Sequence, residues 1–259
     1  MNLQVVAFSS ALMLATSLPA IAAPACEAHS GLNTAVLIEL YTSEGCSSCP
    51  PADRQLNQLA TTLEPSAAVV PVALHVDYWD QLGWKDRFAQ PRFTQRQAWL
   101  VHANDRRVVY TPQFFVAGSE FRSSAGVLRD TVRQLNTKPA TAKISLRGAL
   151  SRVDVLTLDV QAATHAGDDV TSLYLGIAEN DLMSQVKGGE NQGTTLAHNH
   201  VVREWFGPFR LQNGTVLARR EITLPSAWRR DRLEIVAFVQ DEHSGAVLQA
   251  LRAEHCAGI

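Results

Sequence analysis

The residues of this chain best suited to chemistry are two cysteines three positions apart, Cys46 and Cys49. A thiolate is the nucleophile of disulfide exchange, and its negative charge must be stabilised. The pair follows an apolar β-type run over residues 36–41 and precedes a predicted helix over residues 52–63. The N-terminus of that helix offers unpaired N–H groups to the first sulfur. We therefore expect Cys46 to attack a substrate and Cys49 to resolve the mixed disulfide.

Two other interpretations of the Cys46–Cys49 pair stay open, a permanently oxidised structural disulfide and a metal site. One such pair supplies only part of a tetrahedral zinc site, and the sequence has no second pair of this spacing. His198 and His200 alone are also an incomplete metal site. We therefore favour a redox-active dithiol and expect no metal.

The remaining cysteines, Cys26 and Cys256, stand near the two ends of the chain. Because the termini of a domain often lie close together, we predict that they form a structural disulfide. In the loop-entropy model, closing so long a loop stabilises the fold by about 5 kcal/mol. Two free thiols on the chain ends are the alternative.

Polar and aromatic side chains follow a second, valine-rich run over residues 68–78. His75 and Asp77 alternate along it and share one face, and Trp79 follows directly. Ligands gather at the C-terminal ends of strands in open α/β sheets, the same edge as the cysteines. These three residues are therefore candidates for substrate binding, with His75 as acid or base. The competing interpretation, which we favour for His75, is an interior side chain with hydrogen-bonding partners.

The elements that position these residues alternate strand and helix in the first half. Apolar runs and helical spacing predict the order β-α-β-α-β-β-α over residues 36–41, 52–63, 68–78, 91–103, 113–118, 120–122 and 124–135. Asn136-Thr137-Lys138-Pro139 then breaks the pattern and indicates a linker. This order is the minimal thioredoxin arrangement, so we predict an α/β thioredoxin-like domain over residues 23–137.

The second half has a period of two instead. Short strands separated by turns are predicted over residues 144–150, 155–163, 172–177, 200–205, 216–224, 233–240 and 246–251. This pattern is typical of a β-sandwich. We therefore expect the thioredoxin-like domain to be followed by an all-β immunoglobulin-like sandwich domain over residues 138–259.

The strand and cysteine pair resemble the active site of thioredoxins. The resemblance implies that Glu39 is a buried acid that accepts or relays the proton of Cys49, although the segment between Glu39 and Cys46 is one residue longer here. It also implies a cis-proline at Thr111-Pro112. Thr111 would then pair with the substrate backbone, and Pro112 would shape the docking surface.

Almost the whole chain after residue 22 also resembles a bacterial secreted family known only as a domain of unknown function, number 1223. The resemblance rests on the segments ELYTSEGCSSCPPAD at residues 39–53, LHVDYWD at 74–80 and GGENQG at 188–193. It supports the fold and the compartment more than any reaction.

The first 22 residues predict export. They carry no charged side chain, their apolar run from Val5 to Leu18 is short for a membrane span, and Ala20-Ile21-Ala22 fits a cleavage site. We predict a signal peptide over residues 1–22, with an uncleaved anchor as the alternative. No later stretch is long and apolar enough to span a bilayer, so we expect a periplasmic or secreted protein without membrane contact. Disulfides persist in that compartment.

Composition narrows the function further. The net charge is −2, and the sequence has no basic stripe, which argues against nucleic acid as a partner. We predict a monomeric extracytoplasmic thiol–disulfide oxidoreductase, acting on protein or small-molecule thiols or disulfides. It needs no organic cofactor, since the dithiol carries two electrons itself. The alternatives are a non-catalytic binding module with a structural CxxC disulfide, and a copper-handling dithiol protein.

Overall fold

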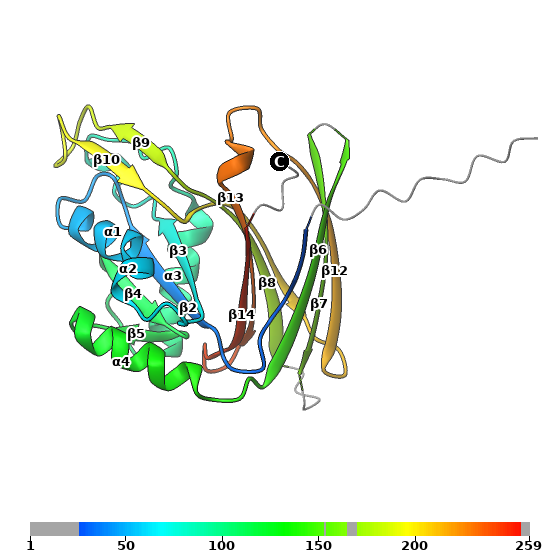
Figure 1. Ribbon diagram of the computed structural model, residues 1–259. Coiled ribbons are helices and arrows are strands. Elements are labelled where there is room, and N and C mark those ends of the chain that lie inside the picture. The colour runs from blue at the N-terminus through cyan, green and yellow to red at the C-terminus, as the bar shows by residue number, and fades with distance from the viewer. Residues whose placement is uncertain (1–25, 153, 165–169, 255–259) are drawn as a thin grey trace, which may run out of the picture.

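Figure 1 shows the computed structural model of the chain, which describes residues 26–152, 154–164 and 170–254. The predicted signal peptide, residues 1–22, and Cys256 lie outside these residues, so the signal peptide and the Cys26–Cys256 disulfide stay predictions. No helix in the described ranges is long and apolar enough to cross a membrane.

The first half of the chain alternates strands with helices, as its apolar runs predict. The predicted helix over residues 52–63 begins earlier than expected and is divided in two by a break at Gln58. The elements are β1 (Cys26–His29), β2 (Val36–Thr42), α1 (Cys49–Asn57), α2 (Leu59–Thr62), β3 (Val69–His75), the short η1 (Asp80–Leu82), α3 (Pro91–Ala103), β4 (Gln113–Val116), β5 (Ser119–Phe121) and α4 (Ala125–Asn136).

The second half is built from strands, as its period of two predicts. They are β6 (Ala142–Arg152), β7 (Val155–Thr164), β8 (Thr171–Glu179), β9 (Leu182–Gln185), β10 (Thr195–His198), β11 (Val201–Arg210), β12 (Thr215–Thr223), β13 (Leu233–Asp241) and β14 (Val247–Glu254), with the short η2 (Arg230–Arg232) before β13.

One mixed sheet of eight strands joins the two halves. Its order is β14-β13-β8-β11-β3-β2-β4-β5. β2 runs parallel to β3, and β11 joins the other side of β3 in parallel, with Val201 opposite Ala73. A four-stranded sheet, β1-β6-β7-β12, and the hairpin β9–β10 complete the strands.

The predicted fold class, an α/β thioredoxin-like domain followed by a separate immunoglobulin-like sandwich, is therefore wrong. β8, β11, β13 and β14 extend the same sheet that carries β2 to β5, and strand is the dominant secondary structure (Figure 1). The physical reason is that strand periodicity fixes which face of a strand is buried but does not fix its neighbour. A sandwich layer does exist, because the four-stranded sheet packs its apolar face against β8, β13 and β14.

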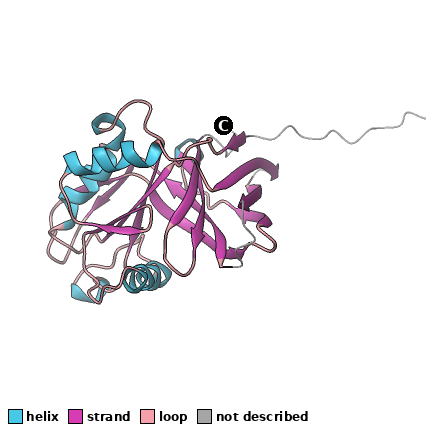
Figure 2. Ribbon diagram, turned by 90° about the horizontal axis from the view of Figure 1, so that it is seen from below, coloured by secondary structure: helices cyan, strands magenta, loops and turns pink. Residues whose placement is uncertain are grey.

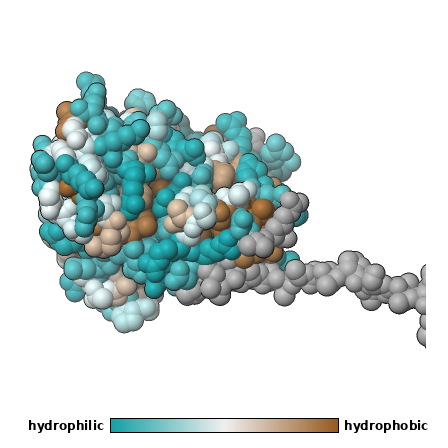
Figure 3. Space-filling model, turned by 90° about the horizontal axis from the view of Figure 1, so that it is seen from above, coloured by the Kyte–Doolittle hydropathy of each residue, from teal (hydrophilic) through white to brown (hydrophobic). Residues whose placement is uncertain are grey.

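Helices cover both faces of the β2–β3 part of the sheet (Figure 2). Ile38 and Leu40 of β2 pack with α1 and α4, whereas Leu37 and Tyr41 face α3. Every residue of β2 is buried, as expected for a central strand. The face drawn in Figure 3 is largely hydrophilic, and its apolar side chains form separate small patches.

A buried ion pair connects β2 to α3. Arg96 Nε donates to Glu39 Oε1 at 2.7 Å, and Arg96 Nη2 donates to Gln240 of β13 at 3.0 Å. The guanidinium also lies 4.9 Å from the ring centroid of Trp205 and 5.1 Å from that of Phe238, which adds cation–π attraction. One side chain of the first half thus contacts strands of the second half.

We predict that Arg96→Ala lowers the free energy of unfolding by about 3–5 kcal/mol, because it leaves the Glu39 carboxylate buried without its cation. Urea unfolding followed by circular dichroism measures this change. The matched control is Arg133→Ala, which removes an exposed ion pair with Asp130 and changes the same quantity by less than about 1 kcal/mol. Equal effects of the two substitutions would contradict the prediction.

Candidate functional site

Cys46 and Cys49 form a disulfide at the start of α1, with their Cα atoms 5.4 Å apart. A short loop leads from the end of β2 to Cys46, and α1 begins at Cys49 with prolines in its first turn. Proline is tolerated there because the first N–H groups of a helix have no partner within the helix. Both cysteines are 0% exposed, although Ser47 and Ser48 between them are exposed.

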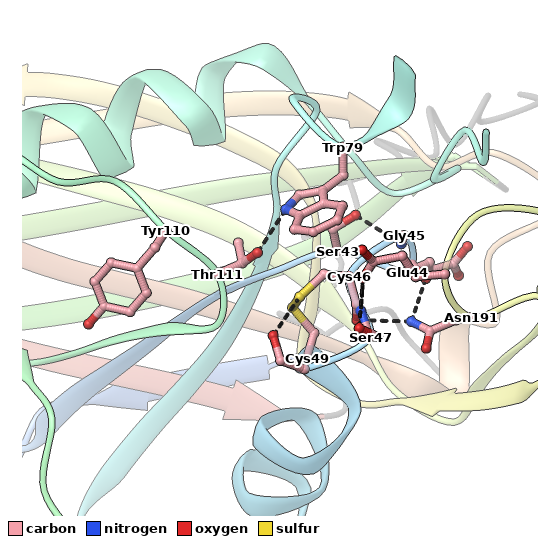
Figure 4. The surroundings of a disulfide bond; sticks show 12 residues. Ser43, Glu44, Gly45, Cys46, Ser47, Cys49, Trp79, Tyr110, Thr111 and Asn191 are labelled. Atoms are coloured by element: carbon pink, nitrogen blue, oxygen red, sulfur yellow. Dashed lines mark hydrogen bonds between the residues drawn. A yellow bond between two sulfur atoms is a disulfide. The ribbon is translucent and has the colours of Figure 1, made fainter. Parts of the chain in front are cut away.

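Two of the predicted substrate-binding residues meet beside this disulfide (Figure 4). Trp79 Nε1 donates a hydrogen bond to Thr111 Oγ1 at 2.8 Å. The Thr111–Pro112 peptide bond is cis, as predicted. All three of these residues are half-buried, and Trp79 and Thr111 lie beside the cysteine pair, with Pro112 next to Thr111 in the chain.

A loop from the second half of the chain holds the backbone around Cys46. Asn191, between β9 and β10, donates from Nδ2 to the carbonyl oxygens of Glu44 and Cys46, both at 2.9 Å. Glu190 Oε2 accepts from Ser47 N at 3.0 Å and from Ser47 Oγ at 2.7 Å. These hydrogen bonds lower the pKa of Glu190, so an ionised carboxylate lies next to the cysteine loop.

Gly188 shows how closely this loop is packed. A Cβ atom at Gly188 would lie 2.3 Å from the carbonyl oxygen of Gly83. This distance is too short for any side chain at Gly188. Gly83 itself has a φ of 100° and ends η1. Glycine is therefore required at both positions for the β9–β10 loop to reach the cysteine loop.

Buried acidic and imidazole side chains form a cluster around α1 and the cysteine loop, which we call the charged cluster. His75 Nδ1 lies 2.6 Å from Asp86 Oδ2, and His198 Nε2 lies 3.3 Å from Glu44 Oε1. Trp84 Nε1 donates to Glu44 Oε2 at 2.7 Å, and the Glu44 N–H donates to Asp86. The cluster consists of Glu44, Asp53, His75, Asp86 and His198, each at most 7% exposed.

The charges of the cluster support one another. Burial alone would lower the pKa of His75, but Asp86, Asp53 and Glu44 outweigh burial and raise that pKa above its ordinary value. Burial alone would raise the pKa of Asp86, but His75 and backbone N–H groups outweigh it and lower that pKa. His75 and Asp86 thus form a buried ion pair.

Asp53 differs from the other carboxyl groups of the cluster. Burial raises the pKa of Asp53, and the nearby His75 and His198 offset only part of this effect. Among the described residues, Asp53 belongs to none of the ion pairs, whereas Glu44 pairs with His198 and Asp86 with His75. The protonated acid is therefore favoured more at Asp53 than at an exposed aspartate.

The structure places the other predicted site residues elsewhere. Glu39 lies on β2 but faces α3, where its carboxylate binds Arg96, so it is not on the α1 side of the sheet. Asp77 Oδ1 accepts a hydrogen bond from Thr94 Oγ1 of α3 at 2.5 Å. His75 is interior and belongs to the charged cluster.

His198 and His200 do not share a site. His198 faces Glu44, whereas His200 Nδ1 lies 3.1 Å from Glu234 Oε2 of β13. Within the part of the chain that the structure describes, no three His, Cys, Asp or Glu side chains are arranged to hold a metal ion.

The chain matches the family model described as a protein of unknown function (DUF1223) over residues 37–240. Fold and cysteine pair thus define a mixed-sheet protein with a buried CxxC disulfide, and the chain belongs to the DUF1223 family. None of the curated proteins matches it.

Solved structures with the same fold include two bacterial proteins. Protein AGR_C_4864 from Agrobacterium tumefaciens is 21% identical, with a TM-score of 0.61, covering 86% of this chain and 95% of that one. HBP35 of Porphyromonas gingivalis is 16% identical, with a TM-score of 0.68, covering 87% of this chain and 76% of that one. At this identity the likeness concerns the fold alone.

Sequence reasoning missed most of the charged cluster and its neighbours. Asp53 stands four residues after Cys49, a spacing that places two side chains on one helix face, and this signal was available. Glu44 also lies inside the cysteine segment. His198 was visible only as half of a histidine pair, and Glu190 and Asn191 only within the segment 188–193. Like Asp86, they are brought to the cysteines only by the folded chain.

We predict that the charged cluster makes stability depend on pH through His75. The pKa of His75 is raised in the folded protein, so its contribution is complete below the ordinary histidine pKa and is lost as the pH rises through the folded value. The pKa of Asp86 is lowered, so its contribution is present above the ordinary aspartate pKa and is lost as the pH falls through the folded value.

His75→Gln should therefore lower the free energy of unfolding by about 3 kcal/mol near neutral and mildly acidic pH. The difference from the wild-type protein should narrow as the pH rises through the folded pKa of His75. Urea unfolding across a pH series measures both effects. The exposed His102, changed to Gln, is the control, and a pH-independent cost of His75→Gln would contradict the assignment.

A further prediction concerns Glu190. Its carboxylate disfavours a thiolate at the neighbouring Cys46, so Glu190→Gln should lower the pKa of the Cys46 thiol in the reduced protein. Alkylation of Cys46 by iodoacetamide near pH 7, followed by peptide mass spectrometry, should become faster by about two- to fivefold, a modest factor because water screens an exposed charge. Glu64→Gln, at an exposed position on another loop, should leave the rate unchanged. A slower reaction of the Glu190→Gln protein would refute this electrostatic role.

Proposed function

We propose that this protein is an extracytoplasmic thiol–disulfide exchange protein whose Cys46–Cys49 pair alternates between disulfide and dithiol. The observation that carries the proposal is the disulfide itself, formed across three positions at the start of a helix and next to Trp79 and Thr111 (Figure 4), the residue that precedes the cis-Pro112. The export pattern of residues 1–22 supports a location where such a pair meets oxidants and reductants.

The reaction begins at Cys46. A substrate thiolate attacks the Cys46 sulfur, a mixed disulfide forms, and the bond to Cys49 breaks with Cys49 as the leaving thiolate. A second substrate thiol then releases Cys46, so that two electrons have moved from the substrate to the cysteine pair. Cys46 is the attacked sulfur because it precedes the helix, and the exposed Ser47 and Ser48 follow it directly. In the reverse direction the dithiol reduces a substrate disulfide.

Substrate access requires a local opening, since both cysteines are fully buried. The Trp79 indole, held by Thr111, and Ser47, held by Glu190, lie beside the disulfide (Figure 4). Val108 and Val109, 62% and 38% exposed, precede Thr111 and offer apolar contact to a protein substrate.

A second candidate function rests on that same burial. A disulfide that no substrate reaches is a structural link, and the protein would then be a binding module without redox activity. The two functions differ in one measurable quantity, the reduction potential of the pair.

We predict a reversible couple between about −120 and −270 mV, the range of exchange proteins. The measurement is equilibration with glutathione buffers, trapping of thiols and peptide mass spectrometry of the segment that holds Cys46 and Cys49. Cys46→Ser controls for alkylation of Cys49 alone. A pair that stays oxidised below about −300 mV is typical of structural disulfides and would establish the binding module instead.

A further inference from the structure

The burial of Cys49 creates a chemical demand, if the proposed exchange function holds. Cys49 is 0% exposed, so the thiolate released when the disulfide opens forms away from water. A buried anion without a partner is strongly disfavoured, and the group takes up a proton instead. That proton must come from a neighbouring protein group.

Asp53 is placed to supply it. Cys49 and Asp53 stand four residues apart on α1 and are both among its buried residues. Side chains at this spacing are neighbours on one helix face, with Cβ atoms about 5–6 Å apart. Glu39, which the thioredoxin resemblance suggested for this role, is engaged with Arg96 next to α3.

The charges around Asp53 favour a stored proton. The groups facing it are Thr42 at the end of β2, His75 at the end of β3, His198 at the end of β10 and Asp86 of the loop before α3. Glu44 also belongs to this cluster, while Arg54, the next residue of α1, is exposed.

One carboxyl of the cluster, Asp53, stands outside its ion pairs. Two imidazoles, His75 and His198, pair with two carboxylates, Asp86 and Glu44. Asp53 belongs to neither pair, and its burial raises its pKa and so favours the protonated acid. The imidazole atom His75 Nε2 has no hydrogen-bond partner among the described residues.

We propose that Asp53 delivers a proton to Cys49 when the disulfide opens and takes it back when the disulfide closes. On opening, the S–S electron pair leaves with Cys49, the Asp53 proton moves to that sulfur, and Asp53 becomes a carboxylate. Asp53 stays a carboxylate in the dithiol form. On closing, the carboxylate accepts the Cys49 proton as the sulfur attacks the mixed disulfide at Cys46.

The test compares the titration of the Cys49 thiol in variants that carry Cys46→Ser. The ultraviolet absorbance of the thiolate is followed against pH, and the signal of the Cys46→Ser, Cys49→Ser double variant is subtracted, so that Cys49 alone is read. Adding Asp53→Asn should move the midpoint to lower pH by about one pH unit or more, because the carboxylate beside the thiolate is gone.

Glu39→Gln is the matched control, since it removes another fully buried carboxylate next to the same sheet, and it should leave the midpoint in place. An unchanged midpoint with Asp53→Asn, or an equal movement with Glu39→Gln, would overturn the assignment. Circular dichroism checks that each variant folds, and Asp53→Ser serves as the second variant if Asp53→Asn does not fold.

The glutathione equilibration of the wild-type protein separates the two proposals. If the wild-type cysteine pair resists reduction, the proposed exchange function is refuted, and so is the proton transfer as a catalytic step. A wild-type pair that exchanges normally, together with a Cys49 titration that ignores Asp53, removes only the role of Asp53.

Discussion

The site depends on one strand pairing, the parallel contact of β11 with β3. The Ala73 N–H donates to the carbonyl of His200 at 2.8 Å, and Val201 lies opposite Ala73. This register places His198, just before β11, next to His75 at the end of β3, with their ring centroids 5.2 Å apart. The β9–β10 loop, which precedes the strand that ends in His198, is thereby brought onto the cysteine loop.

The two halves of the chain therefore complete each other at the cysteines. Glu44 comes from the first half and finds its imidazole partner, His198, in the second. Asn191 caps the carbonyl of Glu44 and is a second donor to the carbonyl of Cys46, which also accepts from the Cys49 N–H. The same union is made on the far face of β2, where Arg96 joins Glu39 to Gln240. Only in the joined sheet does Glu44 reach its imidazole partner and Arg96 its second hydrogen-bond acceptor, Gln240.

The local elements could be predicted from the sequence, but their association could not. Hydrophobic periodicity located β2, β3, α3 and most later strands, and the cysteine spacing predicted the disulfide. Glu39 shows the limit. Successive residues of a strand point to opposite faces, so an error of one residue in the expected position moves the acid to the other face. Leu40, not Glu39, faces α1. His198 was visible only as part of a histidine pair, since its partner Glu44 lies far away in the sequence.

The charged cluster is hard to explain by stability alone. Replacing a buried ion pair by well-packed apolar side chains is often neutral or stabilising, and α1 needs no carboxyl at Asp53 to pack against β2. A disulfide that only stapled the chain would function equally well over an apolar layer. Placing three buried carboxyl groups and two buried imidazoles at the loop and helix that carry a buried disulfide is useful when the number of protons at that disulfide changes. Opening a disulfide makes that change, because each of the two electrons that enter the pair is matched by a proton.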